Sequence, residues 1–276
     1  MNFLKSFLKG QKPPTPNEEP PQPPEATPLD RPNPETPHFI VGDLHGALDL
    51  LEHILEQIDH VIGNLDLPDP KLVFVGDYID KGPSSAAVLK RLHELATEFP
   101  ENVTCILGNH EQMMLDFMEA PEARHARWFR NGAAQTLASF GIELPVEAEW
   151  AATSNAIAMA LRGQLGDAME DWLRALPASV RSGNLMIAHA GADPARAVSD
   201  QSPRVLLWGH PEFLTRVRTD GQWIAHGHTP QEQATCTEGR ISLDTGAFST
   251  GCLTAAVVLP DGTVEFLQTL QPRVAT

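Results

Sequence analysis

Cysteine, basic side chains and long apolar runs are all scarce in this sequence of 276 residues. Its three cysteines form no closely spaced motif, which argues against a disulfide-stapled secreted domain. No apolar run approaches the ~20 residues that a membrane-spanning helix needs, and no secretory signal is evident. We therefore expect reduced thiols and a cytoplasmic protein without a transmembrane segment.

The shortage of positive charge excludes a further class. Lysine and arginine number 20 against 36 aspartates and glutamates, which gives a formal net charge of −16. Nucleic-acid backbones are bound through Lys and Arg, so we expect no nucleic-acid partner. Hydrophobic residues make up 42% of the chain, enough for a sizeable buried core.

Proline is abundant but unevenly placed. Residues 1–37 hold 11 of the 24 prolines, and such a composition predicts a disordered tail that precedes a single domain over 38–276. Within the tail, residues 1–10 carry apolar side chains at helical spacing beside two lysines. They form either a docking segment for a membrane surface or partner, or a frayed terminus. The terminus is favoured because isolated helices this short are marginal.

Strand-like and helix-like segments alternate after the tail. Short runs rich in Val and Ile predict buried parallel strands, at 38–42, 71–76 and 102–108. Helices are predicted after each of them, at 46–62, 83–99 and 110–118. A helical insert over 122–176 follows, with breaks near 141–145 and 163–166, and then strands at 184–188, 223–225, 240–243, 253–259 and 263–268. This alternation is typical of an α/β fold with right-handed crossovers.

Polar blocks stand at the ends of the first three predicted strands. They are Gly42-Asp43-Leu44-His45-Gly46, Gly76-Asp77-Tyr78-Ile79-Asp80-Lys81-Gly82 and Gly108-Asn109-His110-Glu111, and two later blocks add His189, His226 and His228. Ligands bind at the carboxyl ends of strands in open α/β sheets, so we expect these side chains to share one rim. Asp and His are ligands for Mn, Fe and Zn, and the central Asp77 suits a bridge between two ions. Each block alone could be a capped turn or a half-buried histidine, but the series favours a two-metal centre.

The blocks together resemble the motifs of a known family. GDLHG (42–46), GDYIDKG (76–82), GNHE (108–111), HAG (189–191) and GHTP (227–230) resemble those of the calcineurin-like metallophosphoesterases, and most closely those of bacterial phosphoprotein (serine/threonine) phosphatases. The resemblance covers about 38–268, with a closing DTGA-like stretch at 243–247. It implies an α/β fold, a four-layer β-sandwich flanked by helices, with the helical insert.

The resemblance also implies a role for each matched residue. Asp43 and His45 would bind one metal ion, Asp77 would bridge, and Asn109, His189 and His228 would bind the second ion. Mn is the favoured metal for both positions, with Fe or Zn as alternatives. His110, oriented by Asp80, would be the general acid opposite a metal-activated water. The implied phosphate- or substrate-binding residues are Lys81, Asn109 and His210. Residues 128–132 resemble a WxxNG stretch of bacterial relatives, in which Asn131 or Arg130 either reaches the phosphate or marks a helix break.

Two positions depart from the family pattern. Lys81 stands where GDxVDRG has an arginine, and His210 stands where a W-x-R segment has a second one. Lysine lacks the bidentate fork of arginine, and histidine is charged only below about pH 6.5. Both changes weaken the grip on phosphate. Three arginines at 124, 127 and 130 form either a basic stripe over the acidic rim or a solvated helix face, and the solvated face is favoured.

Three functions remain open from the sequence. The leading hypothesis is a metal-dependent phosphoric monoester hydrolase of the serine/threonine protein phosphatase type, acting on a phosphorylated protein or a small phosphate ester. The alternative is a dinucleoside polyphosphate hydrolase. A phosphate- or metal-sensing protein with weak catalysis is suggested by Lys81 and His210, but the complete ligand set favours an enzyme.

Overall fold

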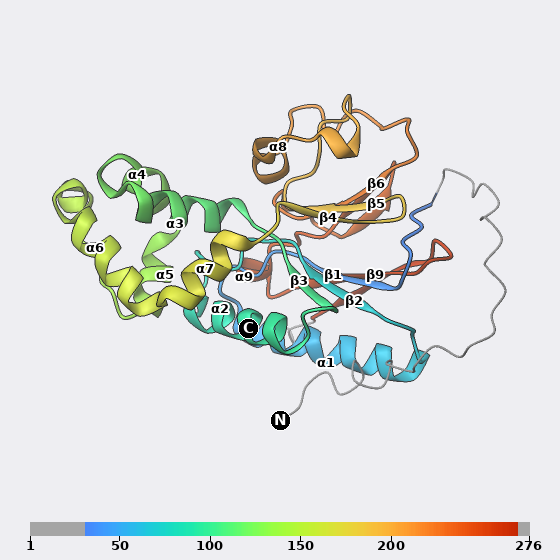
Figure 1. Ribbon diagram of the computed structural model, residues 1–276, viewed down its shortest axis with the longest axis horizontal. Helices are drawn as coiled ribbons and strands as arrows, with labels where there is room; N and C mark the ends of the chain where they lie inside the picture. The colour runs from blue at the N-terminus through green and yellow to red at the C-terminus, as the bar shows by residue number, and fades with distance from the viewer. Residues whose placement is uncertain (1–30, 270–276) are drawn as a thin grey trace, which may run out of the picture.

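Two five-stranded mixed sheets face each other at the centre of the structure, a computed structural model that describes residues 31–269 (Figure 1). The first sheet has the order β10-β9-β1-β2-β3, with β1 His38–Val41, β2 Lys71–Phe74, β3 Val103–Cys105, β9 Thr254–Val258 and β10 Val264–Gln268. The second has the order β4-β5-β6-β8-β7, with β4 Ser179–Ser182, β5 Leu185–Ala188, β6 Trp223–His226, β7 Thr235–Thr237 and β8 Arg240–Ser242. In each sheet three strands run parallel, β1, β2 and β3 in one and β5, β6 and β8 in the other.

Helices cover the outer faces of both sheets and complete four layers. Helices α1 (Leu48–Leu65) and α2 (Ser85–Glu98) lie on the first sheet, and α8 (Pro203–Trp208) lies on the second (Figure 1). The inner layer is apolar, with Ile40 and Val73 facing Ile187 and Ala225 across the two sheets. The predicted α/β four-layer sandwich is thereby confirmed.

Sequence periodicity explains how α1 meets its sheet. Its buried residues recur three or four positions apart, as in Leu51, Ile54, Leu55, Ile58 and Ile62. Such spacing places them on one face, which packs on the first sheet. The helix begins directly after Ala47, so it extends away from the block at 42–46 that ends β1.

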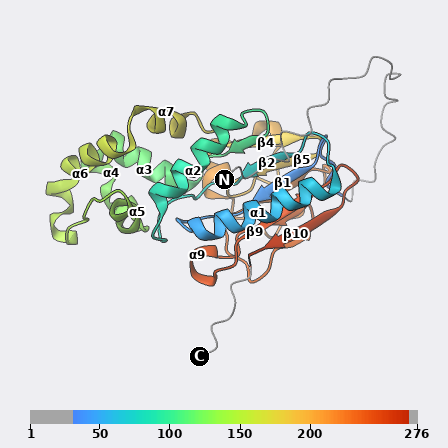
Figure 2. The same cartoon turned by 90° about the horizontal axis from the view of Figure 1, so that it is seen from below.

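A lobe of further helices stands beside the sandwich (Figures 1 and 2). It comprises α3 Asn109–Glu119, α4 Pro121–Phe129, α5 Ala133–Ser139, the 3₁₀ turn Glu147–Glu149, α6 Trp150–Leu165 and α7 Asp167–Ala175. The predicted insert and its two breaks match this lobe, since α5 ends before 141–145 and Gly166 separates α6 from α7. Within residues 31–269, no helix has the length and hydropathy needed to cross a membrane.

Two edge strands and two short helices were not predicted from the sequence. Strands β4 and β7 are the two edges of the second sheet, and neither is buried. Edge strands of three or four residues need no apolar alternation, so the sequence carries little signal for them. Helices α8 and α9 (Ala247–Thr250) have only six and four residues, which is too short for helical periodicity to appear.

The start of the domain also differs from the expected boundary. Residues 31–37, which we assigned to the disordered tail, pack against the sandwich. The backbone N–H of Asn33 donates to Asn184 Oδ1 at 2.6 Å, and three prolines of the segment are buried. The proline-rich composition predicted disorder for these residues, but they are ordered because they form contacts with the second sheet. The tail over 1–30, including the docking segment at 1–10, lies outside the described residues.

Candidate active site

The polar residues of the motif blocks converge where the parallel strands end. Asp43 and His45 follow β1, Asp77 follows β2, Asn109 begins α3 after β3, His189 follows β5, and His228 follows β6. Two groups of these side chains bring their ligand atoms within 4.8 Å of one another, namely His45, Asp77 and His110, and Asp77, His189 and His228. Asp77 belongs to both groups, as a ligand that bridges two metal ions would.

The carboxylate of Asp77 faces one group with each oxygen. Its Oδ1 lies 3.2 Å from His189 Nε2, and its Oδ2 lies 3.5 Å from His45 Nε2. The side chain is almost fully buried. Burial raises its pKa, but three neighbouring histidines outweigh this and hold the pKa of Asp77 below its usual range. The carboxylate is therefore ionised and central.

Two histidines present lone pairs to this carboxylate. The Nδ1–H of His45 donates to the Ile79 carbonyl at 2.8 Å, and the Nδ1–H of His189 donates to the Val75 carbonyl at 2.9 Å. Burial lowers the pKa of both rings, that of His45 to about 3. A neutral ring that donates through Nδ1 has a lone pair at Nε2, so both lone pairs point toward the ionised Asp77. Cations between them would relieve the repulsion.

Asn109 adds an oxygen to the second group. Its Oδ1 lies 2.8 Å from His189 Nε2 and 3.1 Å from His228 Nδ1. Turning the amide over would place N–H hydrogens there instead, whereas a metal ligand requires the oxygen in this position. Imidazole nitrogens, carboxylates and an amide oxygen form a donor set that fits Mn, Fe or Zn.

Asp43 lies beside the cluster without belonging to either group of described residues. Its carboxylate accepts the backbone N–H of His228 at 3.0 and 3.2 Å. Burial and the charges of Asp244 and Asp77 raise its pKa well above the usual value. Three carboxylates gathered in this way need a nearby cation. Gly227 is required beside them, because a Cβ there would lie 1.8 Å from Asp43 Oδ1.

His110 and Asp80 form the predicted pair. His110 Nδ1 lies 2.6 Å from Asp80 Oδ2, and its Nε2 lies 3.8 Å from Asp77 Oδ2. Burial lowers the pKa of His110, but the charge of Asp77 and the hydrogen bond with Asp80 outweigh it and raise the pKa above its usual value. A protonated imidazole directed at the cluster suits a general acid.

The insert fixes Asp80 through two residues that we did not predict. Trp128 Nε1 donates to Asp80 Oδ2 at 3.0 Å, and Thr136 Oγ1 donates to Asp80 Oδ1 at 2.6 Å. Burial raises the pKa of Asp80, while these donors and His110 oppose the rise. Within the stretch 128–132, Trp128 contacts the site directly through Asp80.

Backbone strain is concentrated at the same residues. His45, Asp77, Asp80, Lys81 and His228 all have φ between 43° and 71°, a left-handed conformation that L-residues seldom adopt. Strain of this kind persists only where the surroundings fix it, and it clusters at functional sites. No sequence pattern predicts this strain.

Glu111 organises the loop that carries Asp77. Its buried carboxyl group accepts four backbone N–H groups, those of Asp77, Tyr78, Ile79 and Gly108. Burial and the charge of Asp77 raise the pKa of Glu111 to about 8. Whether ionised or neutral, both carboxyl oxygens can accept, whereas an amide nitrogen cannot.

Replacing Glu111 with glutamine is therefore expected to destabilise the fold. At least one buried N–H loses its acceptor, at a cost of about 1–3 kcal/mol per group. Urea unfolding of the Glu111→Gln variant measures this loss. Glu119→Gln, an exposed change on the same helix, should stay within about 0.5 kcal/mol of the wild type. Equal midpoints for the two variants would contradict this role of Glu111.

The predicted substrate-binding residues differ in how near they lie to the cluster. Lys81 Nζ lies 2.8 Å from His45 Nε2 and 5.1 Å from the ring centre of Phe248, so it reaches the cluster. His210 lines a hollow that also contacts His228. Asn131 is exposed, and its amide donates to the Arg127 carbonyl at 2.6 Å. It closes the end of α4, and its role in phosphate binding stays a prediction.

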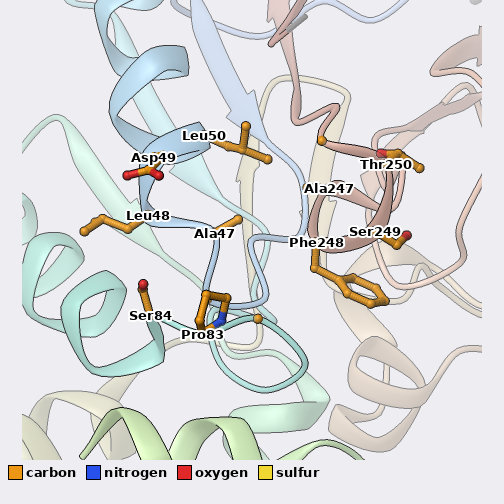
Figure 3. A pocket seen from close by; sticks show the side chains of 13 residues that line it. Ala47, Leu48, Asp49, Leu50, Pro83, Ser84, Ala247, Phe248, Ser249 and Thr250 are labelled. Atoms are coloured by element: carbon orange, nitrogen blue, oxygen red, sulfur yellow. The ribbon is translucent and has the colours of Figure 1, made fainter. Parts of the chain in front are cut away.

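A second hollow borders the cluster on the side of Phe248. It has a volume of about 310 Å³ and lies between the first turn of α1, residues 82–84 and α9 (Figure 3). The ring of Phe248 is 44% exposed and meets the His45 ring edge to face at 5.5 Å. The cluster thus has a hollow on either side, one beside Phe248 and one beside His210.

Comparison with known proteins agrees with this geometry. A bis(5'-nucleosyl)-tetraphosphatase PrpE of Oceanobacillus iheyensis is 28% identical over 234 residues, 78% of this chain and 86% of that protein. A serine/threonine-protein phosphatase 1 of Salmonella typhimurium is 28% identical over 225 residues, 79% and 90% of the two chains. A solved protein serine/threonine phosphatase of Saccharomyces cerevisiae shares the fold, with a TM-score of 0.53 at 15% identity over 87% of this chain and 82% of that one. The family model of the calcineurin-like phosphoesterases matches residues 37–241. The chain therefore belongs to the calcineurin-like phosphoesterases, hydrolytic enzymes with a dinuclear metal site.

Proposed function

We propose that this phosphoesterase hydrolyses phosphoric monoesters of the phosphoserine and phosphothreonine type, with Mn as its metal. The observation that carries the proposal is the His110–Asp80 pair, joined at 2.6 Å and directed at the cluster. Two divalent ions held by the cluster would polarise the phosphoryl oxygens and lower the pKa of a bound water. The remaining chemistry belongs to side chains of this chain.

His110 is positioned to protonate the leaving oxygen of the ester. Asp80 holds Nδ1, so that Nε2 faces the cluster and can give up its proton there. An alkoxide is a poor leaving group, so protonation by a fixed acid accelerates its departure. Lys81 adds a positive charge beside His45 that can attract the phosphate.

A second candidate is the hydrolysis of a dinucleoside polyphosphate. Its support is the likeness to the PrpE tetraphosphatase. The GNHE and GDYIDKG blocks favour the monoesterase, because the resemblance of these blocks is to the protein phosphatases. In this structure, Glu111 of GNHE supports the whole loop from Asp77 to Ile79.

Metal removal and restoration test the proposal. Chelated protein should not hydrolyse p-nitrophenyl phosphate, and Mn²⁺ should restore turnover. Fe²⁺ and Zn²⁺ added separately test the choice of metal, and metal analysis of the protein as purified gives the resident ion. A folded, metal-loaded protein without turnover would favour the phosphate- or metal-sensing function instead.

Substrate comparison separates the two enzymatic candidates. Specificity constants for a phosphoserine peptide and for a bis-nucleoside tetraphosphate should favour the peptide. The reverse order would transfer the assignment to the polyphosphate hydrolase.

We also propose that the protein lies in the cytoplasm, on the support of three cysteines that form no disulfide in the structure. Cell fractionation tests that placement.

A further inference from the structure

The hollow beside His210 opens directly from the metal cluster. It has a volume of about 430 Å³, and its lining includes Ala190, Arg204, Trp208, His210, Phe213 and His228. His228 belongs to the second ligand group, and Ala190 follows the ligand His189 in the chain. A substrate bound at the cluster would therefore have this hollow next to its phosphate.

Two arginines at or beside this hollow are not neutralised: Arg204 lines it, and Arg127 lies against the lining residue Trp208. Within residues 31–269, eight arginines form ion pairs with carboxylates, namely Arg91, Arg130, Arg162, Arg174, Arg196, Arg216, Arg218 and Arg240. Arg127 and Arg204 form none within that part of the chain, although the protein carries a net charge of −16. In so acidic a protein, unpaired guanidinium groups next to a phosphate site are available for an anion.

Arg127 lies against an aromatic ring that lines the hollow. Its guanidinium carbon lies 3.8 Å from the ring centre of Trp208. A guanidinium stacked on a ring uses its face and keeps its N–H donors in the plane for an anion. The next residue of α4, Trp128, donates to Asp80. The same end of α4 thus fixes the general acid and presents Arg127.

Arg204 lines the same hollow as His210, the residue that stands where the family pattern has an arginine. His210 replaces the arginine of the W-x-R segment, and its Nδ1 already accepts the N–H of Glu212 at 3.2 Å. Its Nε2 faces Asp193 at 3.9 Å. His210 is therefore a weak anion ligand, whereas Arg204 precedes it by six residues and lines the same hollow.

We propose that Arg127 and Arg204 form a second anion site, which binds an additional negatively charged group of the substrate while the reacting phosphate lies at the cluster. The group is a phosphate or a carboxylate, since guanidinium binds both in bidentate fashion. The inference rests on the proposed phosphatase function, because it assigns this site to the substrate of that reaction.

Paired ligands test the site on the Mn-loaded full-length chain. Fructose 1,6-bisphosphate and fructose 6-phosphate differ by one phosphate. Two phosphoserine peptides that carry either two glutamates or two glutamines after the phosphoserine differ only in carboxylates. Calorimetry gives the affinity ratio within each pair, and phosphate release is measured in parallel. The test variant combines Arg127→Gln with Arg204→Gln. The matched control is Arg181→Gln, because Arg181 is an exposed arginine of β4 without a described ion pair.

The wild type and the Arg181→Gln control should prefer the more anionic member of one pair. In the double variant the affinity ratio of that pair should fall about tenfold, the scale of a lost charge-assisted contact. In the kinetics, the change should appear in KM and not in kcat. A loss in the sugar pair identifies a phosphate, and a loss in the peptide pair identifies a carboxylate. An unchanged ratio in both pairs overturns the inference. Binding ratios that behave as expected without phosphate release overturn the proposed function alone.

Discussion

Replacing His110 with asparagine is expected to lower kcat for a phosphoserine peptide by ~10²–10⁴-fold, the contribution typical of a positioned general acid. The loss should be smaller for p-nitrophenyl phosphate, whose leaving group is a stable anion that needs little protonation. Metal content should stay at the wild-type value. Steady-state kinetics on the two substrates and metal analysis of the same preparation measure these outcomes.

The same measurements distinguish a general acid from a metal ligand at His110. Its Nε2 lies near Asp77 and His45 and falls within the first ligand group. If His110 were a ligand, the His110→Asn variant would lose metal, and both substrates would suffer equally. Such a result would remove the residue from the role of acid.

The positioning role of Asp80 has a separate signature. Its carboxylate stabilises the imidazolium of His110 through the 2.6 Å contact. The Asp80→Asn variant should therefore have a lower pKa at His110, and the alkaline limb of the kcat profile should move to lower pH. A variant that lost activity equally at every pH would show disturbed packing around Trp128 and Thr136 instead.

The sequence predicted the cluster well because its ligands stand directly at strand ends. Once β1, β2 and β3 are recognised as parallel strands, their carboxyl ends meet at one rim. Asp43, Asp77 and Asn109 then approach one another without any knowledge of side-chain packing. The same reasoning reached His189 and His228 through β5 and β6.

The supporting contacts could not be predicted in this way. Trp128 and Thr136 reach Asp80 from helices that lie 48 and 56 positions further along the chain, and no local pattern encodes that packing. Three of the four N–H groups that donate to Glu111 lie in the turn after β2, where Asp77 has a positive φ, and the fourth precedes α3. The amide of Asn131 closes the end of α4, a local contact that its motif-like position does not reveal.

Replacing Asp77 with asparagine should abolish the dinuclear site. The change removes the negative charge and one of the two lone-pair oxygens that face the two ligand groups. Because both groups depend on this residue, metal content should fall below two ions per chain. Activity should fall by more than the ~10–100-fold that loss of an outer-shell partner costs.

Thermal unfolding shows the effect of Asp77 independently of turnover. A ligand that binds only the folded state raises the melting temperature, so Mn²⁺ should stabilise the chelated wild type. Asp77→Asn should show little of this rise. Asp171→Asn, an exposed change on α7, should show all of it. Asp43→Asn provides an intermediate case, because the family resemblance assigns Asp43 to the first ion alone, and the group of Asp77, His189 and His228 should still hold the second. Full binding of two ions and a normal rise in Asp77→Asn would contradict the bridging role and would require each ion to be held by its own histidines alone.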